Sequence, residues 1–172
     1  MRKNVSSILQ KYAGGEADTS LDLILHEEAQ KFLSEKDFLI FCSLDLDTIF
    51  AEKFQKSGNQ LLSEFSKYNY AIREIIQQIR IGRISKKQTA GHKEFEHFLT
   101  PGNPLEEEQQ LLKYQWDKLD ELSLEHYTDF SALISYKLKL LILLRWWSFN
   151  AETGFERFQQ ASKPMMGGQA NG

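Results

Sequence analysis

Apolar side chains recur three, four and seven positions apart over most of this sequence, and no stretch alternates apolar and polar residues with the period of a strand. This spacing is typical of helices that bury one face. It predicts an all-α fold, a single bundle of about six to seven helices. The expected helices cover residues 3–12, 19–33, 34–57, 59–81, 104–122, 129–149 and 150–161, with at most one further short helix at 93–99.

Capping residues and glycines mark the expected helix ends. Ser34 is followed three residues later by Asp37, which is the pattern of a capping box. Asn103 before Pro104 favours a helix start, because the asparagine can accept free N–H groups and proline has none to leave unpaired. Gly82 is expected to end the helix that precedes it.

The composition fits one globular domain. The chain has 172 residues, of which 41% are hydrophobic, and we expect a helical domain at 1–163 followed by a disordered tail at 164–172. The longest apolar run, 138–149, contains two basic residues and is shorter than the roughly 20 residues that a membrane-spanning helix needs. The amino terminus lacks the apolar block of an export signal. These features predict a protein of the cytoplasm.

Few residues suggest chemistry. The single Cys42 excludes an intramolecular disulfide, and its apolar neighbours predict a small buried side chain rather than a nucleophile. Asp45 and Asp47 lie two positions apart, so on a helix they would point in different directions and form no carboxylate pair. No phosphate loop or dinucleotide fingerprint is present. The sequence predicts no enzyme activity and no bound cofactor.

One pair of residues resembles part of a metal site. Glu94 and His97 have the i, i+3 spacing of the di-iron helical bundles. Those bundles need a second such pair, and none of the other three histidines has an acid three residues before it. A solvated polar turn is therefore the favoured interpretation, and a helical metalloprotein is the third hypothesis for function.

Charge is segregated along the chain. Residues 73–93 contain six basic side chains and one acid, whereas residues 94–129 contain ten acids and two lysines. The two segments are therefore expected to face one another or to face charged partners. A sequence pI near 5.8 argues against a nucleic-acid partner.

Two regions of the sequence resemble known families. The stretch NYAIREIIQQIRIGR at 69–83 resembles a helix of the C-type subunit of the V/A-type ATP synthases. The stretches LKYQW at 112–116 and LKLLILLRWW at 138–147, followed by a Glu-Thr-Gly turn, resemble a family of unknown function encoded in bacterial V-type ATP synthase operons. Together the resemblance covers about residues 34–160.

The resemblance implies a non-catalytic adaptor that links the central stalk to the membrane rotor ring and passes torque between proton or sodium movement and ATP turnover. It makes Arg73, Arg80 and Arg83 the candidates for protein contact. The partners would be the proteins of the stalk and the ring, and the protein would reach the cytoplasmic face of the inner membrane only through them. The implied role needs no cofactor.

Two alternatives remain open. Arg73 could instead pair with an acid of the helix at 104–122, while Arg80 and Arg83 cap free carbonyls near Ile81. The protein could also be a free-standing helical interaction or regulatory protein unrelated to the ATPase.

Overall fold

Helices make up all the regular structure that is described. The computed structural model describes residues 20–85 and 104–149. The expected helices at 3–12, 93–99 and 150–161 and the tail at 164–172 lie outside these residues. Within them the all-α fold is confirmed by α2 (Ser20–Phe32), α3 (Glu35–Cys42), α4 (Glu52–Gln55), α5 (Gln60–Ser85), α7 (Pro104–Leu122) and α8 (Phe130–Trp147).

Side-chain caps start two of the helices where the sequence predicts. Ser34 Oγ accepts a hydrogen bond from the Asp37 backbone N–H at 3.2 Å and donates one to Asp37 Oδ2 at 2.7 Å, which stabilises the start of α3. Asp129 Oδ1 accepts from the Ala132 N–H at 2.9 Å at the start of α8. This bond, together with His126, lowers the pKa of Asp129. The helix expected at 104–122 is present as α7, and Asn103, its expected cap, lies outside the described residues.

The prediction of a single helix at 34–57 is wrong. The structure divides it into α3, a segment of turns at 43–51 and α4. Asp45 Oδ1 accepts from the Asp47 N–H at 2.7 Å, and such local side-chain bonds compete with the helical pattern. The turns bury Ile49, whose carbonyl accepts from Ser66 Oγ of α5 at 2.6 Å.

Two further expectations about helix ends and burial are corrected. Cys42 is exposed at the last position of α3, whereas its neighbour Phe41 is fully buried. The helix containing Gly82 continues to Ser85. One glycine inside a helix costs only about 1 kcal/mol, which the preceding turns of a long helix can offset.

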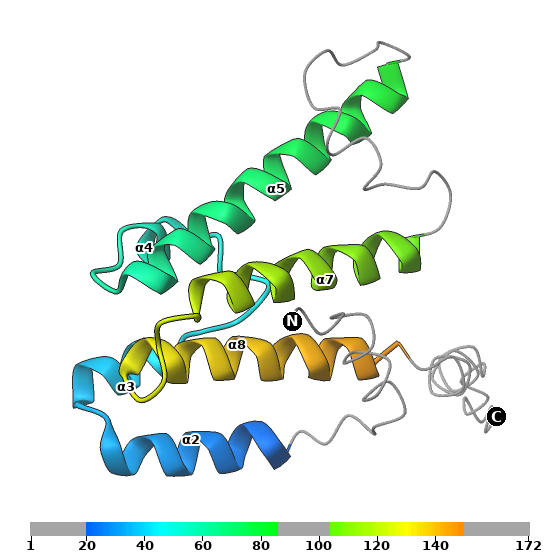
Figure 1. Ribbon diagram of the computed structural model, residues 1–172. Helices are drawn as coiled ribbons and strands as arrows, with labels where there is room; N and C mark the ends of the chain where they lie inside the picture. Colours follow the sequence, from blue (N-terminus) through cyan, green and yellow to red (C-terminus); the bar gives the residue numbers. More distant parts are fainter. Residues whose placement is uncertain (1–19, 86–103, 150–172) are drawn as a thin grey trace, which may run out of the picture.

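The helices lie in a row, in the order α2, α8, α7 and α5 (Figure 1). α5 and α8 run in one direction and α7 runs in the other. Asn59 Nδ2 donates to Ser131 Oγ at 2.9 Å and joins the amino-terminal ends of α5 and α8. From there α5 diverges, so its last turns extend beyond the other helices (Figure 1).

The core lies between the helices, toward the end of the molecule at which α5 and α8 begin. Large side chains with at most 2% exposure come mainly from the first half of α5, from α7 and from α8, together with Phe41 of α3 and Ile49 of the turns. They include Leu61, Leu62, Phe65, Leu112, Leu119, Ile134, Leu138 and Ile142. Among the described side chains of α5, none beyond Ile72 is buried. The divergence of α5 therefore separates a packed end of the molecule from an open one.

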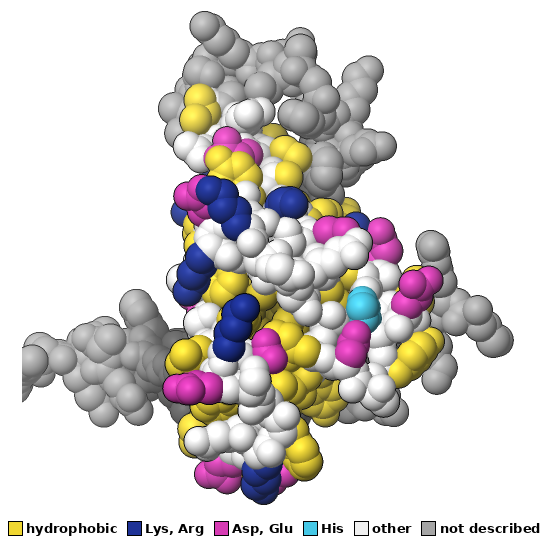
Figure 2. Space-filling model, turned by 90° about the vertical axis from the view of Figure 1, so that its left-hand side faces the viewer, with side chains coloured by type: hydrophobic (Ala, Val, Ile, Leu, Met, Phe, Trp, Pro, Cys, Tyr) yellow, Lys and Arg dark blue, Asp and Glu magenta, His cyan; other side chains and the backbone are white. Residues whose placement is uncertain are grey.

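Charges are mixed on the end of the molecule that includes α3 and α4. Basic and acidic side chains alternate there around exposed apolar ones (Figure 2). Among the helices of 20–85 and 104–149, none is long and apolar enough to cross a membrane.

Candidate partner-binding groove

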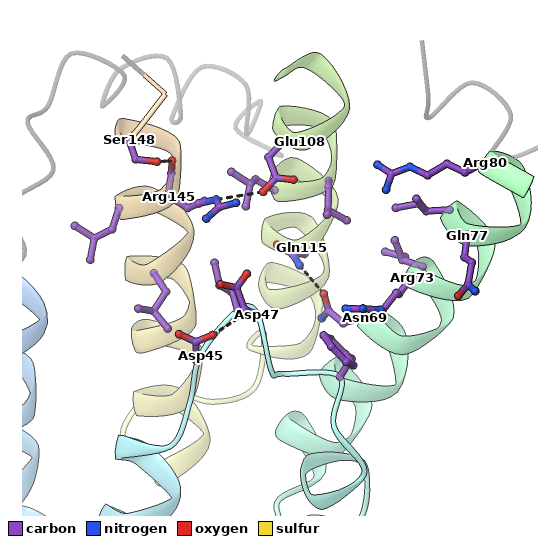
Figure 3. A pocket seen from close by; sticks show the side chains of 18 of the residues that line it. Asp45, Asp47, Asn69, Arg73, Gln77, Arg80, Glu108, Gln115, Arg145 and Ser148 are labelled. Carbon is purple, nitrogen blue, oxygen red and sulfur yellow. Dashed lines mark hydrogen bonds and ion pairs between the residues drawn. The ribbon is translucent and has the colours of Figure 1, made fainter. Parts of the chain in front are cut away.

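A groove of about 920 Å³ opens where α5 diverges from α7 and α8 (Figure 3). α5 forms one wall and α8 the other, α7 lies between them, and the segment at 43–51 crosses from the α8 side to α5. The lining residues are Asn69, Ile72, Arg73, Ile76, Gln77, Arg80 and Ile81 of α5; Glu108, Leu111, Leu112 and Gln115 of α7; Leu141, Leu144 and Arg145 of α8, with Ser148 directly after it; and Asp45, Leu46, Asp47 and Phe50.

Apolar side chains at helical spacing form the inner surface of the groove. Ile72 and Ile76 are one turn apart on α5, and Leu141 and Leu144 are one turn apart on α8. Ile72 is buried, whereas the other three are half-buried. An apolar surface that is left partly open between two helices is the kind of surface that a third helix can cover.

A pair of buried amides crosses the inner end of the groove. Gln115 Nε2 donates to Asn69 Oδ1 at 2.6 Å, and Asn69 Nδ2 donates to the Phe65 carbonyl at 2.8 Å (Figure 3). Both amides are 5% exposed. Gln115 Oε1 is buried and has no hydrogen-bond partner among the described residues. The pair fixes α7 against α5 just before α5 diverges.

Replacing Asn69 with alanine is expected to lower the free energy of unfolding by about 1–3 kcal/mol, because it leaves the buried Gln115 amide without its acceptor. Urea unfolding followed by circular dichroism measures the change. Gln77→Ala, an exposed amide on the same helix, is the matched control and should change stability by less than about 0.5 kcal/mol. Equal effects of the two substitutions would show that the buried pair adds nothing.

Arginines line the α5 wall. Arg73 and Arg80, two of the three contact candidates, both face this groove, whereas the side chain of Arg83 lies outside the described residues. The Arg73 guanidinium lies 4.1 Å from the centre of the Phe50 ring, which is a cation–π contact. Arg80 lies 3.4 Å from Glu107 Oε2.

These contacts correct the alternative pairing considered from the sequence. Arg80, and not Arg73, pairs with an acid of α7. Among the described residues no carboxylate lies within 4 Å of Arg73. The expectation that the basic and acidic segments face one another is thus met at Arg80 and Glu107, while Arg73 keeps its charge available to a partner.

The opposite wall carries acids that the sequence analysis set aside. Asp45 and Asp47 are not on a helix, so the argument that they point apart is wrong, and both line the groove. On the same side, Arg145 Nε donates to Glu108 Oε1 at 3.2 Å. The groove therefore has a basic edge on α5 and an acidic edge at 45–47.

A second buried polar cluster joins α2, α3 and α8. Lys137, 1% exposed, donates from Nζ to the Phe41 carbonyl at 2.7 Å and lies 2.9 Å from His26 Nε2. His26 Nδ1 lies 2.7 Å from the Asp22 carbonyl oxygen. A neutral ring protonated at Nδ1 donates to that carbonyl and accepts from the ammonium at Nε2.

Burial lowers the pKa of Lys137, and the negative charges of Asp22, Cys42 and Asp45 oppose that shift. The cluster was missed because Lys137 lies in an apolar run and its partners are about a hundred positions away in the sequence. Its contacts are all internal, so it holds α2 and α3 on α8 and is not part of the groove.

No described residues form a group of three potential metal ligands. Glu94 and His97, the pair on which the metalloprotein hypothesis rests, lie outside the described ranges.

One family model matches part of the chain. It is described as a protein of unknown function (DUF2764), and it matches residues 93–169. The chain is similar to DUF2764 over this span. The span includes α7 and α8, and so the Arg145–Glu108 side of the groove, but not Arg73 or Arg80. No curated protein and no solved structure matches the chain.

Proposed function

We propose that this protein is a non-catalytic adaptor of a bacterial V-type ATPase or ATP synthase, similar to the C-type subunit of these machines, which links the central stalk to the membrane rotor ring. The observation that carries the proposal is the position of Arg73 and Arg80. These residues come from the resemblance, and both line one wall of an open groove.

The groove suits protein contact for two physical reasons. Its inner surface is apolar, so a partner that covers it gains the free energy of burying that surface. Its edges are charged, and charged edges fix the orientation of a partner and speed its association. The packed end of the helices would carry torque, and partner contacts would be confined to the open end.

The proposed partners are the proteins of the stalk and the ring, and the proposed location is the cytoplasmic face of the inner membrane, reached only through them. This location would need no membrane-spanning helix. The similarity to DUF2764 fits an uncharacterised family and carries no function of its own.

A free-standing helical interaction protein is the second candidate. The groove favours it equally, because a groove of this kind binds a helix whatever complex that helix belongs to. The two candidate functions differ in which proteins are expected to co-purify with this protein from its host.

Tagged protein isolated from gently solubilised host membranes is expected to bring with it the catalytic subunits of the ATPase, the stalk and the ring, together with ATPase activity. Mass spectrometry and an ATPase assay on the eluate measure this. Recovery of the protein alone, from the soluble fraction, would overturn the adaptor proposal and leave the free-standing one.

Charge reversal at the groove tests which surface is used. Arg73→Glu combined with Arg80→Glu is expected to lower recovery of the stalk and ring about tenfold or more, since like charges facing each other across an interface cost more than the roughly 1.4 kcal/mol of a tenfold change. Lys67→Glu, an exposed residue of α5 outside the groove, is the matched control. Equal recovery from all three proteins would place the contact elsewhere.

A further inference from the structure

The α5 wall of the groove presents two arginines to an occupant. Arg73 and Arg80 are seven residues apart, which is about two helical turns and about 10 Å along the helix axis. Within residues 20–85 and 104–149, no carboxylate lies within 4 Å of Arg73. The Arg80 side chain is 62% exposed and lies 3.4 Å from Glu107 Oε2. The wall therefore keeps positive charge that an occupant with carboxylates can neutralise.

Between these charges the groove is apolar over a length that suits a helix. Its lining on α5 extends from Asn69 to Ile81, which is about 18 Å, the length of a helix of about twelve residues. Ile76 on α5 and Leu144 on α8 are half-buried, so both have apolar surface left to cover. The walls are helices and offer no strand edge, so an occupant that buries its backbone here must satisfy its own hydrogen bonds, as a helix does.

The two ends of the groove differ in charge. Asp45 and Asp47 lie toward the inner end, where Asn69 and Gln115 are bonded, whereas Arg80 lies toward the outer end (Figure 3). The amino terminus of a helix is its positive end and has N–H groups without a partner in the helix. An occupying helix is therefore favoured with its amino-terminal end toward the two aspartates, which makes it parallel to α5 and α8.

We infer that the partner segment in this groove is an amphipathic helix with acidic residues seven positions apart on the edge that faces Arg73 and Arg80. Its apolar face covers Ile76 and Leu144, and its amino-terminal end lies against the acids at 45–47. The inference rests on the proposed function, under which this helix belongs to a protein of the stalk or the ring. It adds the chemistry by which that segment is recognised.

Two synthetic peptides test the inference on the purified full-length protein. Both have about twelve residues, the same apolar face and a hydrocarbon staple that keeps them helical, because a helix this short is marginal in water. The acidic peptide has glutamates on both edges of that face, and the basic peptide has lysines at the same positions. Fluorescence anisotropy of the labelled peptides measures the two dissociation constants.

The acidic peptide is expected to bind at least about tenfold more tightly than the basic peptide. The net charge of the chain is −3 and favours the basic peptide, so attraction to the overall charge cannot produce this result. Arg73→Glu combined with Arg80→Glu should reverse the preference. The matched control, Lys67→Glu combined with Lys113→Glu, makes the same change of charge at exposed positions outside the groove and should leave the preference unchanged at physiological ionic strength.

Several results would overturn the inference. They are equal affinity for the two peptides, tighter binding of the basic one, no binding of either at about 1 mM, and an equal loss of preference in the groove and control variants. A protein dimer that dissociates as peptide is added, followed by light scattering, would make a second copy of the chain the occupant and also overturns it. None of these results bears on the isolation from host membranes, so failure of the inference is distinguishable from failure of the adaptor proposal.

The orientation of the helix has its own test. The acidic peptide with a free amino terminus is expected to bind about threefold more tightly than its acetylated form, because its ammonium faces the two aspartates. Asp45→Asn combined with Asp47→Asn keeps the side-chain acceptor of the local hydrogen bond and should remove this difference. Equal affinity of the two forms for the unaltered protein, or a difference that persists in the variant, overturns the orientation.

Discussion

Replacing Lys137 with alanine is expected to lower the free energy of unfolding by about 2–5 kcal/mol, the range for truncating a long buried side chain. The four-carbon stem of Lys137 is fully buried in α8, so its removal leaves a cavity. The substitution also takes a hydrogen-bond donor from the Phe41 carbonyl and from His26 Nε2, which ties α2 and α3 less firmly to α8. Chemical denaturation at neutral pH measures the loss.

Lys137→Met is the matched control, because methionine fills most of the same volume without an ammonium. Burying a charge carries a desolvation penalty that methionine avoids, so the loss should stay below about 1.5 kcal/mol. If methionine destabilises the protein as much as alanine does, the hydrogen bonds of the ammonium outweigh the packing of its stem, and the cavity argument fails.

The lowered pKa of Lys137 gives its effect on stability a sign. The folded state releases the proton of this group at lower pH than the unfolded state, whose pKa is near 10.5. Between these two values the unfolded chain binds more protons, so the contribution of this group to stability rises with pH and is complete above the unfolded pKa. In Lys137→Met this part of the alkaline pH dependence should disappear.

Replacing Phe65 with alanine is expected to lower the free energy of unfolding by about 3–5 kcal/mol, the largest effect of a single substitution that we anticipate. Phe65 is fully buried in the first half of α5, where this helix packs on α4, α7 and α8. Because α5 packs on three helices, we expect little collapse of the surrounding structure into the cavity that the substitution leaves. Thermal and urea unfolding measure the change.

Tyr70→Ala provides the control for Phe65→Ala. It removes an aromatic ring from the same helix at a position that is 46% exposed, and it should cost less than about 1 kcal/mol. Phe65→Leu, which leaves a smaller cavity, should fall between the two. A loss at Tyr70 equal to that at Phe65 would mean that the stability of α5 depends on helix propensity and not on packing.

Most helix positions could be predicted because each depends on neighbours in the sequence. The 3.6-residue period and the capping residues Ser34 and Asp129 are local signals, and α3 and α8 begin where these signals indicate. The prediction of one helix over 34–57 failed, because its apolar residues alone do not distinguish a helix from turns that bury the same side chains. There the Asp45–Asp47 hydrogen bond favours the turns over a continuous helix.

The candidate site was only partly predictable. Arg73 and Arg80 could be singled out, and their spacing of seven residues places them on one face of a helix. Which elements face them depends on where α5 diverges, and this follows from tertiary packing. The burial of Lys137 could not be predicted, because the sequence favours an exposed position for a lysine unless its distant partners are known.

The same helix that completes the core also forms the free wall of the groove. Buried side chains restrain α5 from Leu61 to Ile72, so amide hydrogens there should exchange with solvent only when the whole molecule unfolds. Beyond Ile72 the helix has few tertiary restraints among the described residues, and its backbone can open at a lower free energy. The width of the groove can thus fluctuate while the core remains closed, which allows an occupant to enter and leave without global unfolding.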